Sequence, residues 1–220
     1  MSVTTIAGVD VSIVTVLSVG VIPFRELCSV SVAAGTDQSL PVLTGVRLEW
    51  DGSGALTATC TDRFRLATAE TPGVATVCEP GGCLIPVKQL TEYVKGLPKG
   101  AQAGRYVVTV APWEGAVTLS CVTPDGEHTR TIRTLDGQFP SWKTLLPTTF
   151  TGLDGDGIGC DPKYLADIAK LPHEKGARVT VRFNGPTRPM VWEGSTRAPG
   201  ATDRVTWTYL LMPMKAAALS

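Results

Sequence analysis

The chain has few of the residues on which metal binding and acid–base catalysis usually depend. Its 220 residues include only two histidines, and no two of its six cysteines form a C-x-x-C pair. Ligands this sparse argue against a zinc site. The 20 basic and 20 acidic side chains cancel, which excludes a chain that binds nucleic acid by being basic throughout. Any attraction for phosphate must therefore come from positive charge concentrated on one face.

Signatures of nucleotide-binding and hydrolytic enzymes are also missing. There is no G-x-x-x-x-G-K-[ST] loop, no G-x-G-x-x-G turn, and no H-E-x-x-H or G-x-S-x-G motif. Asp154 and Asp156 come nearest to a metal site, but they lack partners at the spacing of a calcium loop and fit a solvated turn. The sequence therefore predicts a protein that is not an enzyme, with no metal and no cofactor.

No hydrophobic run has the length of a membrane-spanning helix. The most apolar stretch, Ile6 to Ile22, contains Asp10 and is rich in Val, Ile, Ser and Thr. Its β-branched residues and partial alternation predict one long strand or two short ones. Because no secretory signal is visible, we expect reduced thiols and a cytoplasmic protein of a bacterium or of a phage-infected bacterial cell.

Three segments have the pattern of short helices: residues 23–34, 86–97 and 161–171. Each has a proline in or beside its first turn, and Gly35, Gly96 or Pro172 at its end. Asp161 is placed to act as the N-cap of the third segment.

Strand-like runs surround each of these helices. One run precedes each helix, at residues 14–22, 83–86 and 152–160. Further runs follow at residues 42–50, 55–61 and 64–69, then 106–111, 116–123 and 128–135, then 178–183, 190–193 and 204–213. Asp-Gly and Asn-Gly dipeptides between many of them predict hairpins. A strand–helix–strand–strand–strand unit thus recurs three times, with starts near residues 14, 83 and 152, which predicts an α+β fold of antiparallel sheets with helices on one face.

Basic residues follow the predicted helices at a helical spacing. Lys88 and Lys95 are seven residues apart, as are Lys163 and Lys170, and seven residues return a helix to nearly the same face. Such a face is either the solvated side of an ordinary amphipathic helix or a surface that meets DNA phosphates without reading bases. The candidate DNA-facing residues are Arg25, Lys88, Lys95, Lys99, Lys163, Lys170 and Lys175.

Five blocks of sequence resemble the bacterial DNA polymerase III beta-subunit sliding clamp. Residues 40–48 (LPVLTGVRL) and 58–67 (ATCTDRFRLA) are similar to the middle domain of that family. Residues 134–147 resemble the segment leaving that domain, and residues 161–165 (DPKYL) the start of the last inner helix. The end of the chain, residues 209–215 (YLLMPMK), is similar to the C-terminal motif of the family.

This resemblance implies a DNA-clamp fold and a processivity factor, in which a closed ring of subunits encircles duplex DNA and tethers a polymerase. The implied partners are double-stranded DNA, bound without sequence preference, a DNA polymerase and a clamp loader. Helices would line the hole, and edge strands of neighbouring subunits would pair to close the ring. A clamp-like binding module that forms no ring, such as a regulator of host replication, is the alternative.

The resemblance also implies a hydrophobic pocket for a partner peptide. Methionines and apolar walls adapt to several short peptides, although Leu43, Leu66 and Leu145 fit an ordinary core equally well. Thr144 stands where the family often has a basic residue. The implied pocket residues are Leu43, Thr61, Arg63, Phe64, Arg65, Leu66, Pro140, Thr144, Leu145, Tyr164, Leu210, Leu211, Met212, Pro213 and Met214.

The number of units departs from the family, whose chains have six where this sequence shows three. We expect a two-unit clamp domain in residues 1–150 and a further half-domain in residues 151–220. A ring of twelve units then needs four chains, and a trimer is the next candidate. The short chain suggests a phage-encoded clamp.

Overall fold

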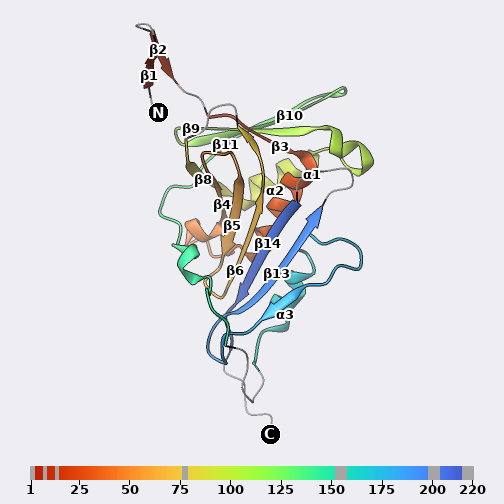
Figure 1. Ribbon diagram of the computed structural model, residues 1–220. Helices are drawn as coiled ribbons and strands as arrows, with labels where there is room; N and C mark the ends of the chain where they lie inside the picture. Colours follow the sequence, from red (N-terminus) through yellow and green to blue (C-terminus); the bar gives the residue numbers. More distant parts are fainter. Residues whose placement is uncertain are drawn as a thin grey trace.

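In the computed structural model, the residues described are 3–6, 9–12, 15–75, 79–151, 158–197 and 204–214. They form three antiparallel sheets of two, five and seven strands (Figure 1). The smallest sheet is a hairpin of β1 (Val3–Ile6) and β2 (Val9–Ser12), which projects from the body near the N-terminus. The α+β class expected from the sequence is confirmed.

Three units supply the strands and helices of the two larger sheets. The first consists of β3 (Leu17–Gly20), α1 (Val21–Cys28), β4 (Gly45–Trp50), β5 (Leu56–Thr61) and β6 (Arg65–Thr71). The second consists of β8 (Gly81–Pro86), α2 (Val87–Gly96), β9 (Val107–Trp113), β10 (Ala116–Thr123) and β11 (Gly126–Arg133). The third has α3 (Pro162–Ile168), β12 (Thr180–Arg182), β13 (Met190–Arg197) and β14 (Arg204–Leu211). A short strand, β7 (Val74–Ala75), pairs with β3.

The first two units exchange their first strands. β8 of the second unit pairs with β4 of the first, and β3 of the first unit pairs with β9 of the second. Each sheet therefore contains a strand from the other unit. The main core is continuous, with buried residues from the first unit (Phe24), the second (Tyr93) and the third (Tyr209).

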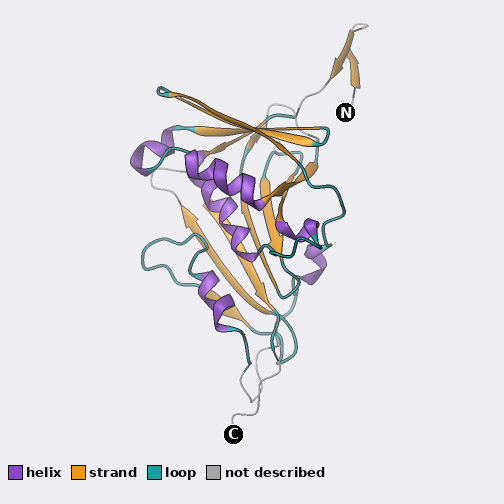
Figure 2. Ribbon diagram, turned by 180° about the vertical axis from the view of Figure 1, so that it is seen from behind, coloured by secondary structure: helices purple, strands orange, loops and turns teal. Residues whose placement is uncertain are grey.

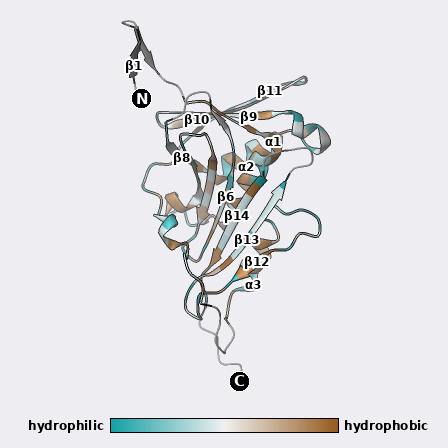
Figure 3. Ribbon diagram, viewed as in Figure 1, coloured by the Kyte–Doolittle hydropathy of each residue, from teal (hydrophilic) through white to brown (hydrophobic). Residues whose placement is uncertain are grey.

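The third unit continues the sheet of the first. β14 pairs antiparallel with β6, from Thr206 opposite Glu70 to Leu211 opposite Arg65, so the seven strands run in the order β12-β13-β14-β6-β5-β4-β8. Hydrophobic residues recur along these strands (Figure 3), because alternate positions face the helices. Among the described residues, β12 and β8 form the two ends of this sheet.

The helices lie on one side of the sheets, as Figure 2 shows from behind. α1 and α2 pack together, with the rings of Phe24 and Tyr93 edge to face at 6.3 Å between centroids. Both side chains are fully buried. The guanidinium Nη2 of Arg25 donates to the carbonyl oxygens of Val94 at 3.0 Å and Leu97 at 3.1 Å. These bonds supply donors to carbonyl groups at the C-terminal end of α2, where intrahelical donors run out.

Several boundaries differ from those that the sequence predicts. The helix expected over 23–34 begins at Val21, and after Cys28 it tightens into a 3-10 segment, Ser29–Ala33, where serines and valines disfavour the α-helix. Residues 42–44, expected to begin a strand, belong instead to the 3-10 turn Pro41–Thr44. The helix expected over 161–171 ends at Ile168, so Lys170 lies in the following turn. Asp154, Asp156 and most of the strand expected over 152–160 lie outside the described residues.

The described cysteines are free thiols. Cys28, Cys60, Cys83 and Cys121 are buried, and Cys160 is half-buried. Burial in the core raises the pKa of Cys83 to about 12, and it raises the pKa values of Cys28 and Cys60 as well. In the described part of the chain, no helix is long and apolar enough to cross a membrane.

Candidate functional site

The turn between β5 and β6 holds Phe64 outward at one end of the large sheet. The Asp62 carboxylate oxygen Oδ1 accepts hydrogen bonds from the backbone N–H groups of Phe64 and Arg65, each at 3.0 Å. Arg63 at the tip adopts the left-handed conformation, with φ of 81°. This conformation is disfavoured for a residue with a side chain, and the surrounding hydrogen bonds keep it in place.

The C-terminal residues run beside this turn. The Met212 backbone N–H donates to the Phe64 carbonyl at 2.9 Å, and the Met214 N–H donates to the Gly159 carbonyl at 2.9 Å. Phe64 is 57% exposed, Met212 43% and Met214 59%. Three large apolar side chains from segments far apart in the sequence therefore reach solvent around one junction.

The outer face of the sheet, opposite the helices, has its own small core at this junction. Leu66, Val191 and Leu210 are buried there with Trp142 of the 3-10 segment Trp142–Leu145. The Trp142 indole N–H donates to a carboxylate oxygen of Glu49 at 3.1 Å, which anchors the segment to β4. Leu145, at the end of that segment, remains 53% exposed. We call the exposed residues Phe64, Leu145, Met212 and Met214 the junction patch.

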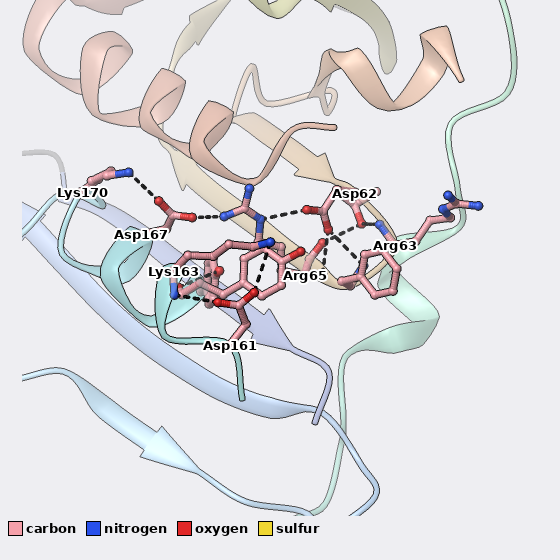
Figure 4. Close-up of polar contacts among 11 residues, drawn as sticks. Asp62, Arg63, Arg65, Asp161, Lys163, Asp167 and Lys170 are labelled. Carbon is pink, nitrogen blue, oxygen red and sulfur yellow. Dashed lines mark hydrogen bonds and ion pairs between the residues drawn. The ribbon is translucent and has the colours of Figure 1, made fainter. Parts of the chain in front are cut away.

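The helix side of the same junction carries a network of charges (Figure 4). The Arg65 guanidinium contacts the carboxylates of both Asp62 and Asp167, the first at 3.1 Å. It also lies 4.6 Å from the ring centroid of Tyr164. Since Arg65 begins β6 and Asp167 belongs to α3, this largely buried ion pair joins the first unit to the third.

The predicted pocket residues are divided between buried and exposed positions. The buried ones are Leu43, Thr61, Leu66, Leu210 and Leu211. The half-buried ones are Arg65, Tyr164 and Pro213, and the exposed ones are Arg63, Phe64, Pro140, Thr144, Leu145, Met212 and Met214. Cross-strand register puts Leu66 and Leu210 on the outer face but Arg65 and Leu211 on the helix side, so they do not share one cavity wall.

The lysines of α2 and of the third unit differ in their surroundings. Lys88, Lys95 and Lys99 are exposed, and no ion pair engages them among the described residues. By contrast, Lys163 pairs with Asp161 at 3.1 Å and Lys170 with Asp167 at 2.6 Å. Among the described lysines of the two helices, those of α2 are therefore the ones whose charge is not offset by an ion pair. Lys175 is exposed in the loop after α3.

Arg25 has a different place from the one suggested by its sequence position. It is half-buried, and its Nη2 atom is engaged by the end of α2 as described above. It stabilises the contact between α1 and α2 and does not stand among the exposed lysines.

Several residues that build the junction have no predicted role in the sequence. Trp142 lies in the segment 134–147 that resembles the family but is not one of the implied pocket residues, and Val191 and Asp167 lie outside every segment that resembles it. A tryptophan next to the predicted pocket residues was the available signal for the outer core. Nothing local in the sequence indicated the pairing of Arg65 with a carboxylate 102 residues away. In the described residues, no group of three or more His, Cys, Asp or Glu is placed to hold a metal ion.

Solved structures with this arrangement of sheets and helices are sliding clamps of DNA polymerases. The clamp from Bacillus subtilis superimposes with a TM-score of 0.69 at 20% identity, over 92% of this chain and 64% of that one. The beta subunit from Thermotoga maritima gives a TM-score of 0.66 at 19% identity, over 94% and 66% of the two chains. The fold is thus the clamp fold.

The family model of the DNA polymerase III beta subunit, central domain, matches residues 24–141, and the chain belongs to this family. The beta sliding clamp of Streptomyces coelicolor is 36% identical over 130 residues, which are 56% of this chain and 32% of that protein. The beta sliding clamp of Micrococcus luteus is 32% identical over 126 residues, covering 56% and 37%. The chain thus spans about a third of the length of these curated relatives in sequence.

Proposed function

We propose that the protein is a non-enzymatic processivity clamp, which encircles duplex DNA as a ring of several chains and tethers a DNA polymerase through the junction patch. The observation that carries this proposal is the patch itself. Four large apolar side chains are exposed around the junction of the first and third units, whose outer face carries the small core of Leu66, Trp142, Val191 and Leu210. A group of exposed apolar side chains at one place is typical of a surface that docks an apolar peptide.

Hydrogen bonds hold the backbone on both sides of the patch. The hydrogen-bonded turn fixes Phe64, and the ladder to β6 fixes the strand that leads to Met212. The two methionines supply flexible, polarisable surface that adapts to different side chains. A clamp loader that uses the same patch would compete with the polymerase for it.

Griselimycin is a suitable probe, because a sliding clamp from Pseudomonas aeruginosa has been solved bound to it, and variants of the patch test whether it binds there. That clamp has a TM-score of 0.69 to this chain at 16% identity. Calorimetry should detect binding of griselimycin to the full chain. Phe64→Asp and Met212→Asp should each weaken it at least about 30-fold, because they introduce an unpaired charge into the apolar contact.

The matched control is Val122→Asp, which makes the same kind of change at an exposed apolar residue of β10. It should leave the affinity unchanged. If griselimycin does not bind, or if all three variants lose binding equally, the junction patch is not the docking site.

Contact with DNA is expected through the exposed lysines of α2. Lys88→Glu with Lys95→Glu should weaken binding to duplex DNA and flatten the dependence of log K on log salt, because fewer counterions are released. Lys143→Glu with Arg204→Glu makes the same change in net charge away from α2 and should have a much smaller effect. Equal slopes of log K against log salt for the two variants would exclude α2 as the DNA-facing surface.

A stable monomer that binds griselimycin but is not retained on circular DNA would favour the alternative function, a binding module that forms no ring.

A further inference from the structure

A cavity of about 740 Å³ lies along the outer edge of β8, at one end of the seven-stranded sheet (Figure 1). Residues 81–84 of β8 line it, together with the turn between β9 and β10 at residues 112–115 and with Thr134, Leu135 and Gly137. This volume is in the range of pockets that bind ligands. None of the described residues that line the cavity belongs to the junction patch or to the exposed lysines of α2.

The backbone of β8 points unpaired hydrogen-bonding groups toward this cavity. The Leu84 carbonyl accepts from the Leu135 N–H at 2.8 Å, so the backbone groups of Leu84 point away from β4. Those of Gly82 point the same way, because the direction alternates along a strand. In the described part of the chain, no strand pairs with this side of β8. The N–H and carbonyl of Gly82 and the N–H of Leu84 are therefore left for a ligand.

Two glycines bring side chains of β4 to this open edge. Gly81 stands opposite Trp50, and a Cβ on Gly81 would lie 2.8 Å from the Trp50 ring. A Cβ on Gly82 would lie 2.8 Å from Nη2 of Arg47. Trp50 and Arg47 are three residues apart on β4 and project to opposite faces of the sheet. The indole and the guanidinium thus lie across β8, one on each face, where a side chain in place of either glycine would exclude them.

The Arg47 guanidinium has donors available for a ligand. Its Nε atom lies 4.0 Å from one Glu49 oxygen, and the other Glu49 oxygen accepts from Trp142. No hydrogen bond engages the two Nη atoms within the described ranges. A guanidinium binds a carboxylate through two parallel N–H donors. Glu79 and Glu114 also line the cavity, so a ligand with a single carboxylate fits better than an acidic run.

An extended peptide that pairs with Gly82 would combine these features. The residue opposite Gly82 exchanges two backbone hydrogen bonds with it and projects its side chain to the same face, where Arg47 lies. Its two neighbours project to the other face, toward Trp50. Trp113, which is 58% exposed on the facing wall, offers further apolar surface. The edge therefore favours the order apolar, acidic, apolar.

We propose that the cavity along β8 binds an extended peptide segment of a partner protein, which adds a strand to β8 and places one carboxylate on Arg47 between two apolar residues. Strand addition of this kind draws affinity from the backbone and specificity from alternate side chains. The site goes beyond the proposed function, because it uses neither the junction patch nor the DNA-facing lysines and requires no association of chains.

Fluorescence anisotropy with a labelled peptide, Thr-Val-Asp-Val-Thr-amide, tests the proposal on the full chain. The peptide should bind saturably with a Kd below about 1 mM. The same peptide with asparagine in place of aspartate should bind at least about 10-fold more weakly, because it cannot form charge-assisted bonds with Arg47. Arg47→Gln should remove this difference between the two peptides. Arg178→Gln, at an exposed arginine of the third unit, is the matched control and should preserve it.

A methyl group on the peptide backbone gives a second readout that leaves the protein unchanged. Methylation of the aspartate nitrogen removes the N–H that would donate to the Gly82 carbonyl, and it should abolish binding. Methylation of the following valine nitrogen, which points away from β8, should change the Kd less than about 3-fold. Absence of saturable binding, equal affinity for the aspartate and asparagine peptides, or equal effects of the two methyl groups would overturn the proposal.

Competition with griselimycin separates this site from the proposed function. Griselimycin should not displace the labelled peptide, and Arg47→Gln should bind griselimycin as the wild type does. Displacement of the peptide would place it on the junction patch and overturn the site at β8, while leaving the proposed function intact. A wild-type protein that binds the peptide but not griselimycin would support the site at β8 and contradict only the docking role of the junction patch.

Discussion

The first and third units have the same order of elements after their first strand, but their helices are buried to very different extents. α1 buries Val21, Pro23, Phe24, Leu27 and Cys28, whereas α3 buries only Asp167 among its own residues. The difference lies in the neighbour, because α1 packs against α2 as well as its sheet, whereas in the described part of the chain α3 packs against its sheet without a second helix. One helix over one sheet leaves part of its apolar side exposed, and a second unit is needed to cover it.

The largest loss of stability is expected from removing a side chain at the contact between α1 and α2. Phe24→Ala should lower the free energy of unfolding by about 3–5 kcal/mol, because it leaves a cavity against Tyr93. Leu165→Ala should lower it by less than about 1 kcal/mol, since its side chain is already partly in water. Urea denaturation at low protein concentration measures both values. Similar losses for the two variants would contradict the difference between the units.

A smaller effect is expected at the junction between the first and third units. Asp167→Ala should cost about 2–4 kcal/mol, because it leaves the largely buried Arg65 guanidinium with one carboxylate instead of two. Lys170→Ala removes the exposed partner of the same carboxylate and should cost less than about 1 kcal/mol. Thermal unfolding of both variants gives the comparison. A larger loss for Lys170→Ala would show that the network is not held by its buried pair.

The smallest effect concerns pH. Burial raises the pKa of Glu26 in α1 from 4.5 to about 7, although the Thr196 hydroxyl of β13 donates to its carboxylate at 3.4 Å. The folded state therefore holds this proton more tightly than the unfolded state does. The stabilising contribution is complete below pH 4.5 and is lost as the pH rises to about 7.

Glu26→Gln should accordingly remove part of the decline in stability between pH 5 and pH 8, by about 1 kcal/mol once partial solvent access is considered. Glu70→Gln, at an exposed glutamate of β6, is the control and should leave the pH profile unchanged. Melting temperatures across this range provide the measurement. Parallel profiles of wild type and Glu26→Gln would contradict the raised pKa.

Local patterns were sufficient for most of the fold. The turn residues Glu114-Gly115 and Asp125-Gly126, with the alternating residues between them, placed β10 at residues 116–123 as predicted. Prolines placed α2 within one residue of its expected ends. The 3-10 segments were missed at Pro41–Thr44 and Ser29–Ala33, because a 3-10 turn has no periodicity that distinguishes it from a strand end or a last helical turn.

The site was only partly predictable, for a physical reason. Phe64, Met212 and Met214 belong to motifs and are exposed around one junction. The place of Arg25 and the partner of Arg65 depend on how elements distant in the sequence pack, which no local pattern encodes. The exchange of β3 and β8 between the first two units could not be predicted either, because the sequence pattern of each unit is the same with or without the exchange.

The left-handed Arg63 at the tip of the turn has a kinetic consequence. A loop already held in an unfavourable torsion by Thr61 and Asp62 has little freedom left to lose when a ligand arrives. If Phe64 belongs to the docking site proposed above, a ligand should bind there without a slow ordering step. Ligands of different affinity should then have similar association rate constants and differ chiefly in their dissociation rate constants.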